Sequence, residues 1–220
     1  MMLSKLSVGE KEKAIRLTLE KKIESISISK IIFTNNYIDS IIFTSKVIGE
    51  CRVKRLTPKG ARSLFEFYFA GLSIESRTKF HPYPLFHSPP GSIDEVSERI
   101  RTWENERNWI IMLIYNENII IGINLLKRIN TEKVTSGLAV RDSFQGKGLG
   151  YLLQILVVEQ ARLLDIEQFH IKVTRDNIPS IKLHEKCGFV KSGEMEYVHE
   201  VSGKSISENV LKMEIKLHYN

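Results

Sequence analysis

A glycine-rich turn stands between an apolar strand pattern and a long helical pattern, and its sequence is Val140-Arg-Asp-Ser-Phe-Gln-Gly-Lys-Gly-Leu-Gly150. Glycine adopts positive φ angles and lets another molecule come close to the backbone. A helix that begins at such a turn presents its first N–H groups and the positive end of its dipole to an anion. Lys147 adds a cation. The segment therefore predicts a phosphate-binding turn at the start of a helix.

Two other nucleotide-binding motifs use the same physics, and neither fits this turn. A P-loop needs a glycine where Arg141 stands and a Ser or Thr where Gly148 follows the lysine. A dinucleotide-binding fingerprint fits Gly146 and Gly148 but needs a small residue in place of Tyr151, and a hairpin pattern precedes it where a βαβ unit should open. A glycine turn that only joins a strand to a helix remains the alternative.

The rest of the chain from residue 51 onward alternates strand and helix patterns. Strand patterns cover residues 51–56, 109–115, 119–126, 134–140, 169–173 and 211–217. Helical patterns begin after Thr57, after Ser92 and at Leu149, and a short one runs from Ile178 to Gly188. The runs 109–115 and 119–126 flank a polar turn, so we expect them to pair as a hairpin.

The first fifty residues follow a separate pattern, and we treat residues 1–50 as an N-terminal extension and residues 51–220 as the main domain. Ile15, Leu19, Ile23 and Ile26 recur at helical spacing between charged residues, which predicts an amphipathic helix. Short strands are expected at residues 30–34 and 37–44. An isolated helix of this size is marginal in water, so we expect its apolar face to pack on residues 51–220 or on a second subunit, as in a homodimer.

Charge and composition exclude several classes of function. The net charge is +6, but the basic residues are scattered among acidic ones without a Lys/Arg block, which argues against nucleic acid as a partner. No run approaches the roughly 18 apolar residues of a membrane helix, and the N-terminus lacks a secretory pattern. Cys51 and Cys187 form no CxxC pair, and the histidines are dispersed. We expect a soluble, cytoplasmic protein without membrane contact or a metal site.

Three segments carry a family resemblance. The spacing Gln-x-x-Gly-x-Gly at Gln145, Gly148 and Gly150 resembles the acetyl-CoA loop of the GNAT superfamily of N-acetyltransferases. The segment Asn177-Ile-Pro-Ser-Ile-Lys-Leu-His-Glu-Lys-Cys-Gly-Phe189 is similar to the family's second signature. Residues 67–77 look like the first-helix region of a GNAT subgroup that includes protein lysine acetyltransferases. The resemblance covers roughly residues 51–219.

The resemblance implies a fold and a cofactor site. The fold is α+β with three α/β/α layers, in which helices flank a mixed, mostly antiparallel sheet that opens between Val140 and the strand at Phe169. Acetyl-CoA would be the acetyl donor and CoA the product. Its pantetheine arm would pair with the backbone of Leu138, Ala139 and Val140. The pyrophosphate would bind the N–H groups of the turn, which comprises Gln145, Gly146, Lys147, Gly148, Leu149 and Gly150. Asn177 and Ser180 would contact the arm from the other side, although Asn177 also fits a helix N-cap.

The resemblance also implies direct attack of an amine on the thioester. The Val140 N–H would stabilise the oxyanion, and the acid position, usually a tyrosine, is His184 here. A packing role for His184 remains open. The position that holds a glutamate base in related lysine acetyltransferases is Thr135, so Glu132, Glu75 or a chain of water molecules would have to act instead.

The sequence thus predicts an acyltransferase, specifically an N-acetyltransferase. It would move the acetyl group of acetyl-CoA to an amine of a small molecule or of a protein or peptide. The alternative is a catalytically weak GNAT-like module that binds acyl-CoA for regulation, since the usual glutamate and tyrosine are both missing. A basic nucleic-acid-binding protein would instead show steeply salt-dependent affinity for DNA or RNA.

Overall fold

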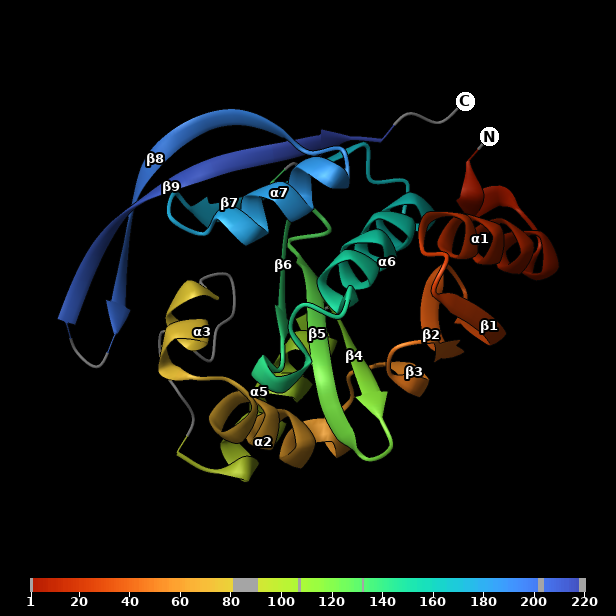
Figure 1. Ribbon diagram of the computed structural model, residues 1–220, viewed down its shortest axis with the longest axis horizontal. Helices are drawn as coiled ribbons and strands as arrows, with labels where there is room; N and C mark the ends of the chain where they lie inside the picture. The colour runs from red at the N-terminus through yellow and green to blue at the C-terminus, as the bar shows by residue number, and fades with distance from the viewer. Residues whose placement is uncertain (1, 81–90, 107, 132, 202–203, 218–220) are drawn as a thin grey trace.

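A single nine-stranded sheet runs through the computed structural model, which describes residues 2–80, 91–106, 108–131, 133–201 and 204–217 (Figure 1). The strand order is β1-β2-β3-β4-β5-β6-β7-β9-β8. The strands are β1 (Ile26–Thr34), β2 (Tyr37–Ser45), β3 (Gly49–Arg55), β4 (Trp109–Asn116), β5 (Ile119–Lys127), β6 (Thr135–Val140), β7 (Gln168–Thr174), β8 (Val190–Val201) and β9 (Lys204–Lys216). All neighbours pair antiparallel except β6 and β7, which are parallel. The mixed, mostly antiparallel sheet is confirmed.

Helices cover both faces of the sheet. They are α1 (Val8–Lys22), α2 (Ala61–Gly71), α3 (Ile74–Lys79), α5 (Ile93–Glu106), α6 (Leu149–Leu163) and α7 (Ile178–Lys186), with 3-10 turns η1 (Leu3–Lys5), η2 (Pro58–Gly60) and η3 (Asp142–Phe144). In Figure 1, α2 and α5 lie together on one side of β4 and β5, and α6 lies on the other side, next to α1. Helix, sheet and helix therefore form the three expected layers.

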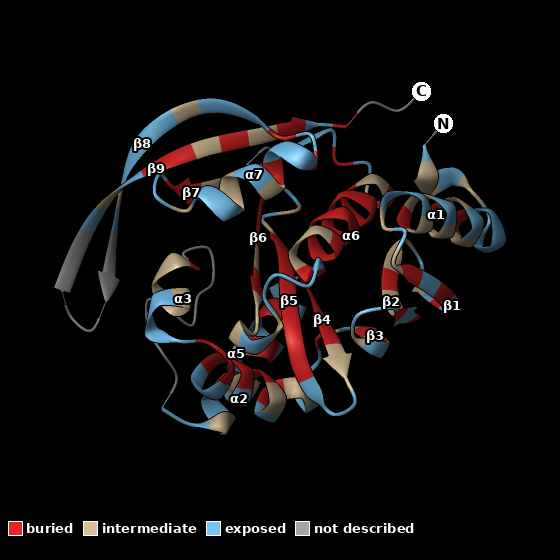
Figure 2. Ribbon diagram, viewed as in Figure 1, coloured by how far each residue is buried: buried red, intermediate tan, exposed pale blue. Residues whose placement is uncertain are grey.

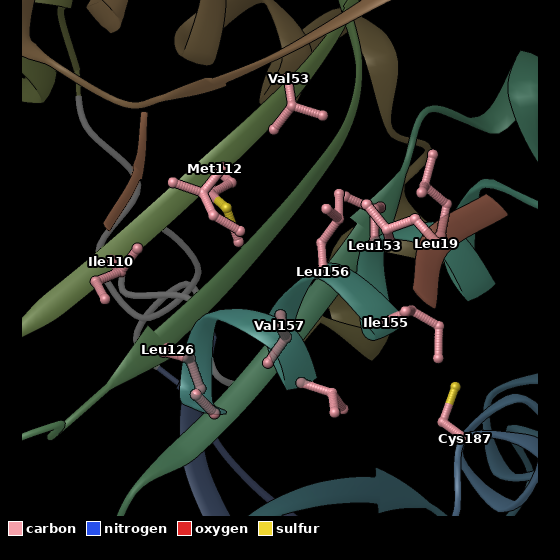
Figure 3. Packing of buried hydrophobic residues seen from close by; sticks show 14 of the residues in the cluster. Leu19, Val53, Ile110, Met112, Leu126, Leu153, Ile155, Leu156, Val157 and Cys187 are labelled. Carbon is pink, nitrogen blue, oxygen red and sulfur yellow. The ribbon is translucent and has the colours of Figure 1, made fainter. Parts of the chain in front are cut away.

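The central strands are apolar on both faces because both faces are covered. Along β4, Ile110, Met112 and Ile114 belong to the core under α6, whereas Ile111 and Leu113 belong to the core under α2 and α5. Buried residues accordingly fill β4, β5 and α6 in Figure 2. Figure 3 shows Met112 on the side of the sheet where Leu153 and Leu156 of α6 lie.

The N-terminal segment extends the sheet and the α6 core. Helix α1 begins with a reciprocal capping box between Ser7 and Glu10, and Ile15 and Leu19 are buried in the same core as α6. The pattern placed Ile26 on this helix, which is wrong: α1 ends at Lys22, and Ile26 is the first residue of β1.

A buried polar side chain ties this segment to α6. Gln160 accepts a hydrogen bond from the N–H of Ile38 and donates one to the carbonyl of Asn36, both at 2.9 Å. The two bonds satisfy backbone groups at the β1–β2 turn that would otherwise face a helix. Gln160, one of the buried polar residues of α6, therefore has defined partners.

Candidate functional site

The sheet opens between its two parallel strands. β6 and β7 pair only at Thr135 and His170, where the His170 N–H donates to the carbonyl of Val134 at 3.1 Å. Beyond that pair the strands diverge, as the family resemblance implied for the cofactor entrance. α6 follows β6 after η3 and the glycine turn, and its first residues line the cavity at this opening.

Backbone donors line this opening. Backbone groups alternate in direction along a strand, and the Arg141 N–H donates to Ile121 of β5 at 2.9 Å. Leu138 and Val140 therefore face the other way, with Val134, towards β7. None of the described strands pairs with them there. The N–H groups of Leu138 and Val140 and the C=O of Leu138 are thus free to pair with an extended ligand, whereas the C=O of Val140 accepts the Gln145 side-chain amide at 3.4 Å.

The glycine turn has the backbone that the sequence predicts. Gly146 and Gly148 have φ angles of +74° and +82°, a region that side-chain-bearing residues rarely adopt. Gly148 is the N-cap of α6 and provides no side-chain cap, so the first N–H groups of the helix are left for another acceptor. A Cβ at either glycine would have no heavy atom within 4 Å, so a ligand has room there.

A cavity of about 640 Å³ joins the opening to the turn. Ten of the expected cofactor residues line it: Leu138, Ala139, Val140, Gln145, Gly146, Gly148, Leu149, Gly150, Asn177 and Ser180. Phe144 and Tyr151 beside the turn also line it, and most of the remaining wall comes from α3, α7 and the residues next to them. The structure thus brings β6 and the turn that follows it together with α3 and α7, which lie far from them in the sequence.

Gly150 differs from the two glycines before it because its surroundings are filled. A Cβ at this position would lie 2.7 Å from Cδ1 of Leu183, so the Leu183 side chain of α7 would have to move. Asn177 caps α7, and its Oδ1 accepts the Ser180 N–H at 3.3 Å. The N-cap alternative for Asn177 is therefore observed, and the residue also lines the cavity.

The wall opposite α7 is held by Asp142. Its carboxylate accepts the Ser73 N–H at 2.8 Å and the Gln145 side-chain amide at 3.1 Å. Burial raises the pKa of Asp142, but hydrogen bonds from the hydroxyls of Ser76 and Ser73 and from the Ser73 N–H lower it further, and the net shift is downward. The sequence analysis did not identify this link, because the two segments lie about seventy positions apart.

The cations at the cavity differ from the one expected. Lys79, Lys182 and Lys186 line the cavity, whereas Lys147 does not. The ammonium of Lys147 lies 4.6 Å from the ring centroid of Phe144 and borders a small neighbouring pocket. Lys147 therefore contributes to the turn through its backbone. Lys182 and Lys186 are four residues apart on a predicted helix, and this spacing could have indicated that they lie on the same side of the site.

His184 does not line the cavity. Its side chain is 4% exposed and packs edge-on against Phe189, with ring centroids 5.4 Å apart. Burial lowers the pKa of His184 to about 4, and a hydrogen bond to the Ser180 backbone only partly offsets this. The ring is therefore neutral near pH 7, contrary to the partial protonation on which an acid role would depend. This placement supports the packing alternative.

The positions considered for the base are separated from one another. Thr135 is buried at the β6–β7 pair, and Glu75 lies in the cavity wall with an ion pair to Lys79 at 2.7 Å. Glu132 lies outside the described residues. Glu75 is therefore the carboxylate from the sequence analysis that, within the described residues, lines the cavity together with Leu138 and Val140.

Three further observations concern other classes of site. None of the described helices combines the length and the apolar character needed to span a bilayer. Within the same residues, no group of three His, Cys, Asp or Glu side chains is arranged to hold a metal ion. Cys51 and Cys187 are both free and buried.

Comparisons with known proteins agree with this geometry. Residues 75–189 match the Acetyltransferase (GNAT) family. An uncharacterized protein of Methanocaldococcus jannaschii is 32% identical over 104 residues, which cover 45% of this chain and 22% of that protein. The L-methionine sulfoximine/L-methionine sulfone acetyltransferase of Pseudomonas aeruginosa is 32% identical over 76 residues, 34% of this chain and 44% of the relative. The chain thus spans less than half the length of these relatives.

Solved structures share the fold at lower identity. A ribosomal-protein α-N-acetyltransferase in complex with coenzyme A has a TM-score of 0.62 at 20% identity, covering 76% of this chain and 94% of the other. The spermidine N-acetyltransferase of Vibrio cholerae, in complex with CoA and spermine, has a TM-score of 0.61 at 19% identity, covering 76% and 95%. With the family matched over more than half of its length, the chain belongs to the GNAT acetyltransferase family.

Proposed function

We propose that the protein is an N-acetyltransferase that moves the acetyl group of acetyl-CoA to an amine. The observation that carries this proposal is the continuous path formed by the unpaired backbone of β6 and the uncapped start of α6, both of which border one cavity. A phosphate fits the uncapped start of α6, and an extended pantetheine arm fits the unpaired backbone of β6. Acetyl-CoA would supply an activated thioester at the end of that arm.

The chain's own groups would bind the donor in two ways. The N–H groups from Gly146 to Gly150 would hold the pyrophosphate, and the nearby Lys182 and Lys186 would add positive charge at the cavity edge. The backbone of Leu138 and Val140 would pair with the amides of the arm as a missing strand would. This arrangement orients the thioester through backbone geometry, which depends little on side-chain identity.

The same backbone would assist the transfer. An N–H of Leu138 or Val140 would donate to the oxygen that becomes negative when an amine attacks. Because His184 is buried and neutral, the proton for the departing thiolate would come from solvent. A thiol with a pKa of about 8.5 is a good leaving group and needs little acid assistance at neutral pH.

Relatives support an amine acceptor without identifying it. Their names specify amino acid analogues, spermidine and a ribosomal protein as acceptors. These acceptors share an amine and little else, so the acceptor of this chain is an amine of a small molecule or of a protein.

A regulatory module that binds acyl-CoA without efficient turnover is the second candidate. It is favoured by the neutral, buried His184 and by a threonine at the expected base position. Such a module would retain the cofactor cavity and lose the chemistry.

One assay separates the candidates. Release of free thiol from acetyl-CoA is followed against a panel of polyamines, amino acids, small amines and peptides, alongside the melting temperature with and without CoA. Amine-dependent thiol release supports the enzyme. A CoA-dependent rise in melting temperature without turnover for any amine supports the module. Absence of both overturns the proposal.

A further inference from the structure

A second, smaller cavity lies where β5, β6, β7 and β8 come together. Its volume is about 150 Å³, and Lys127, Arg128, Thr135, His170 and Lys172 line it together with the ring of Tyr197. A water molecule occupies about 30 Å³ of liquid, so the space suits a group the size of a carboxylate or a phosphate.

The strand register explains why these side chains meet. Lys127 is directly opposite Thr135 on β5 and β6, and Thr135 is paired with His170 on β7. Directly opposite residues project from the same face of a sheet, and Lys172 follows His170 by two positions on that face. Ala139, which shares the parity of Thr135, contacts the α2–α5 core. The small cavity therefore lies on the face opposite α6.

Positive charge is concentrated at Arg128 and Lys172 of this cavity. Within the described part of the chain, Arg128 and Lys172 form no ion pair with a carboxylate. The ammonium of Lys172 lies 4.3 Å from the ring centroid of Tyr197. Arg128 has a φ angle of +59°, a backbone conformation that costs energy for a non-glycine residue. The fold thus accepts strain at a position that brings a guanidinium to this cavity.

The ionisation of the neighbouring groups reflects this excess of charge. Burial lowers the pKa of Lys127 to about 8, and the charges of Arg128 and Lys172 add to the shift. Burial likewise lowers the pKa of His170 to about 4, with Lys212, Lys172 and Arg128 contributing and Glu214 opposing. A negative group in the cavity would relieve this repulsion.

An unpartnered hydroxyl completes the site. Thr135 is 7% exposed, and its Oγ1 has no hydrogen-bond partner among the described residues. A buried hydroxyl without a partner costs free energy, whereas an anion in the cavity would accept a hydrogen bond from it. Cations and a free donor therefore converge on one small space.

We propose that this cavity binds the anionic group, a carboxylate or a phosphate, of the acetyl acceptor. This inference rests on the proposed N-acetyltransferase function. Thr135 precedes Leu138, the nearer of the two possible oxyanion donors, by three residues on β6, a spacing of about 10 Å in a strand. The acceptor would then be an amine that carries a negative group at about that distance, and a polyamine would be repelled by Arg128 and Lys172.

A matched set of acceptors tests the inference. The set has one alkyl length of roughly eight carbons, which spans about 10 Å, and comprises the ω-amino acid, the ω-aminoalkyl phosphate, the neutral-ended monoamine and the diamine. We expect kcat/KM for one or both anionic amines to exceed that for the monoamine and the diamine by about tenfold or more. Comparison of the ω-amino acid with the ω-aminoalkyl phosphate shows whether the cavity prefers a carboxylate or a phosphate. Equal or higher kcat/KM for the diamine would overturn the inference.

Variants connect the preference to the cavity. Lys172→Met and Thr135→Val should remove most of the anionic preference while the monoamine is used as before. Lys216→Met, which alters an exposed lysine at the end of β9, should retain the preference. Retention of the preference in both cavity variants would contradict the assignment.

A binding measurement separates this inference from the proposed function. With CoA at saturation, added inorganic phosphate should raise the melting temperature of the native protein and of Lys216→Met but not that of Lys172→Met. An equal rise in all three proteins would overturn the inference, even if amines are acetylated. If no amine is acetylated yet phosphate acts only through Lys172, the proposed function fails and the anion site stands.

Discussion

The imidazole Nδ1 of His184 lies 2.7 Å from the carbonyl oxygen of Ser180, one turn earlier in α7. Because a carbonyl only accepts, Nδ1 carries the proton, and the tautomer of the ring is fixed. The ring is buried beside Phe189, where a positive charge would be poorly solvated. His184 thus stabilises α7 and its contact with the sheet.

The first prediction concerns the pH dependence of stability. The pKa of His184 is lowered to about 4 in the folded protein, so between pH 6.5 and pH 4 the unfolded chain binds a proton that the folded chain does not. The free energy of unfolding should therefore be highest above pH 6.5 and fall as the pH is lowered to 4, by up to about 3 kcal/mol from this residue. Urea unfolding at several pH values measures the slope.

Variants of His184 distinguish packing from catalysis. His184→Leu should remove the His184 share of the pH dependence between pH 6.5 and 4 and leave the share of His170, whose pKa is also lowered to about 4, whereas His170→Asn should leave the His184 share in place. His184→Ala should lower stability at pH 7, and turnover of the folded variant should change less than tenfold. A tenfold to hundredfold loss of kcat with unchanged stability would restore the acid role.

The second prediction concerns the turn at the start of α6. Gly148→Asp should abolish the rise in melting temperature caused by CoA, because its carboxylate would occupy the position of a phosphate. Gly49→Asp provides the matched control, since Gly49 has a similar φ of +89° and also has no heavy atom within 4 Å of a Cβ. Both variants carry the same strain and charge. An equal loss of the CoA effect in both would attribute it to general destabilisation.

The third prediction concerns the contact of α1 with α6. Leu19 is 1% exposed and Leu17, on the same helix, is 65% exposed. Leu19→Ala should lower the free energy of unfolding by about 2 to 5 kcal/mol, whereas Leu17→Ala should change it by less than about 0.5 kcal/mol. Similarly small effects of both variants would show that residues 1–50 contribute little to the free energy of unfolding. The division of the chain at residue 50 remains a prediction, and deletion of residues 1–49 tests it.

The fourth prediction compares two buried glutamines of α6. Gln160 bonds to Ile38 and Asn36, whereas neither polar side-chain atom of Gln154 has a partner among the described residues. Gln160→Met should lower the free energy of unfolding by about 2 kcal/mol because it leaves two backbone groups unpaired. Gln154→Met should be neutral or stabilising, since it removes an unsatisfied amide. Equal costs would contradict this account.

Local sequence patterns were sufficient to predict a helix or strand where its buried residues recur at the helical or strand period. The helix at Leu149, the strands of the β4–β5 hairpin and the glycine conformations were all predicted correctly. The β8–β9 hairpin was largely missed. β8 is an edge strand with mixed polar and apolar residues on both sides, and β9 inserts between β7 and β8 through pairing that the local sequence does not encode.

The parts of the candidate site that are formed by backbone groups could be predicted from the sequence. The glycine turn and β6 follow from local rules, so their residues converge on the cavity as expected. Side-chain roles depended on distant partners. His184 is buried by Phe189 and the sheet, Lys147 turns towards Phe144, and Asp142 reaches Ser73. Such contacts form only when the whole chain folds.

A single residue pair joins two groups of strands in the middle of the nine-stranded sheet. Strands β1 to β6 form one and β7, β9 and β8 the other, with α6 and its core holding them together. A ligand extended along Leu138 and Val140 would form hydrogen bonds in place of the missing pairing between β6 and β7. Amide hydrogen exchange at these two residues should slow on CoA binding. The bound cofactor would thus make the boundary between β6 and β7 more rigid.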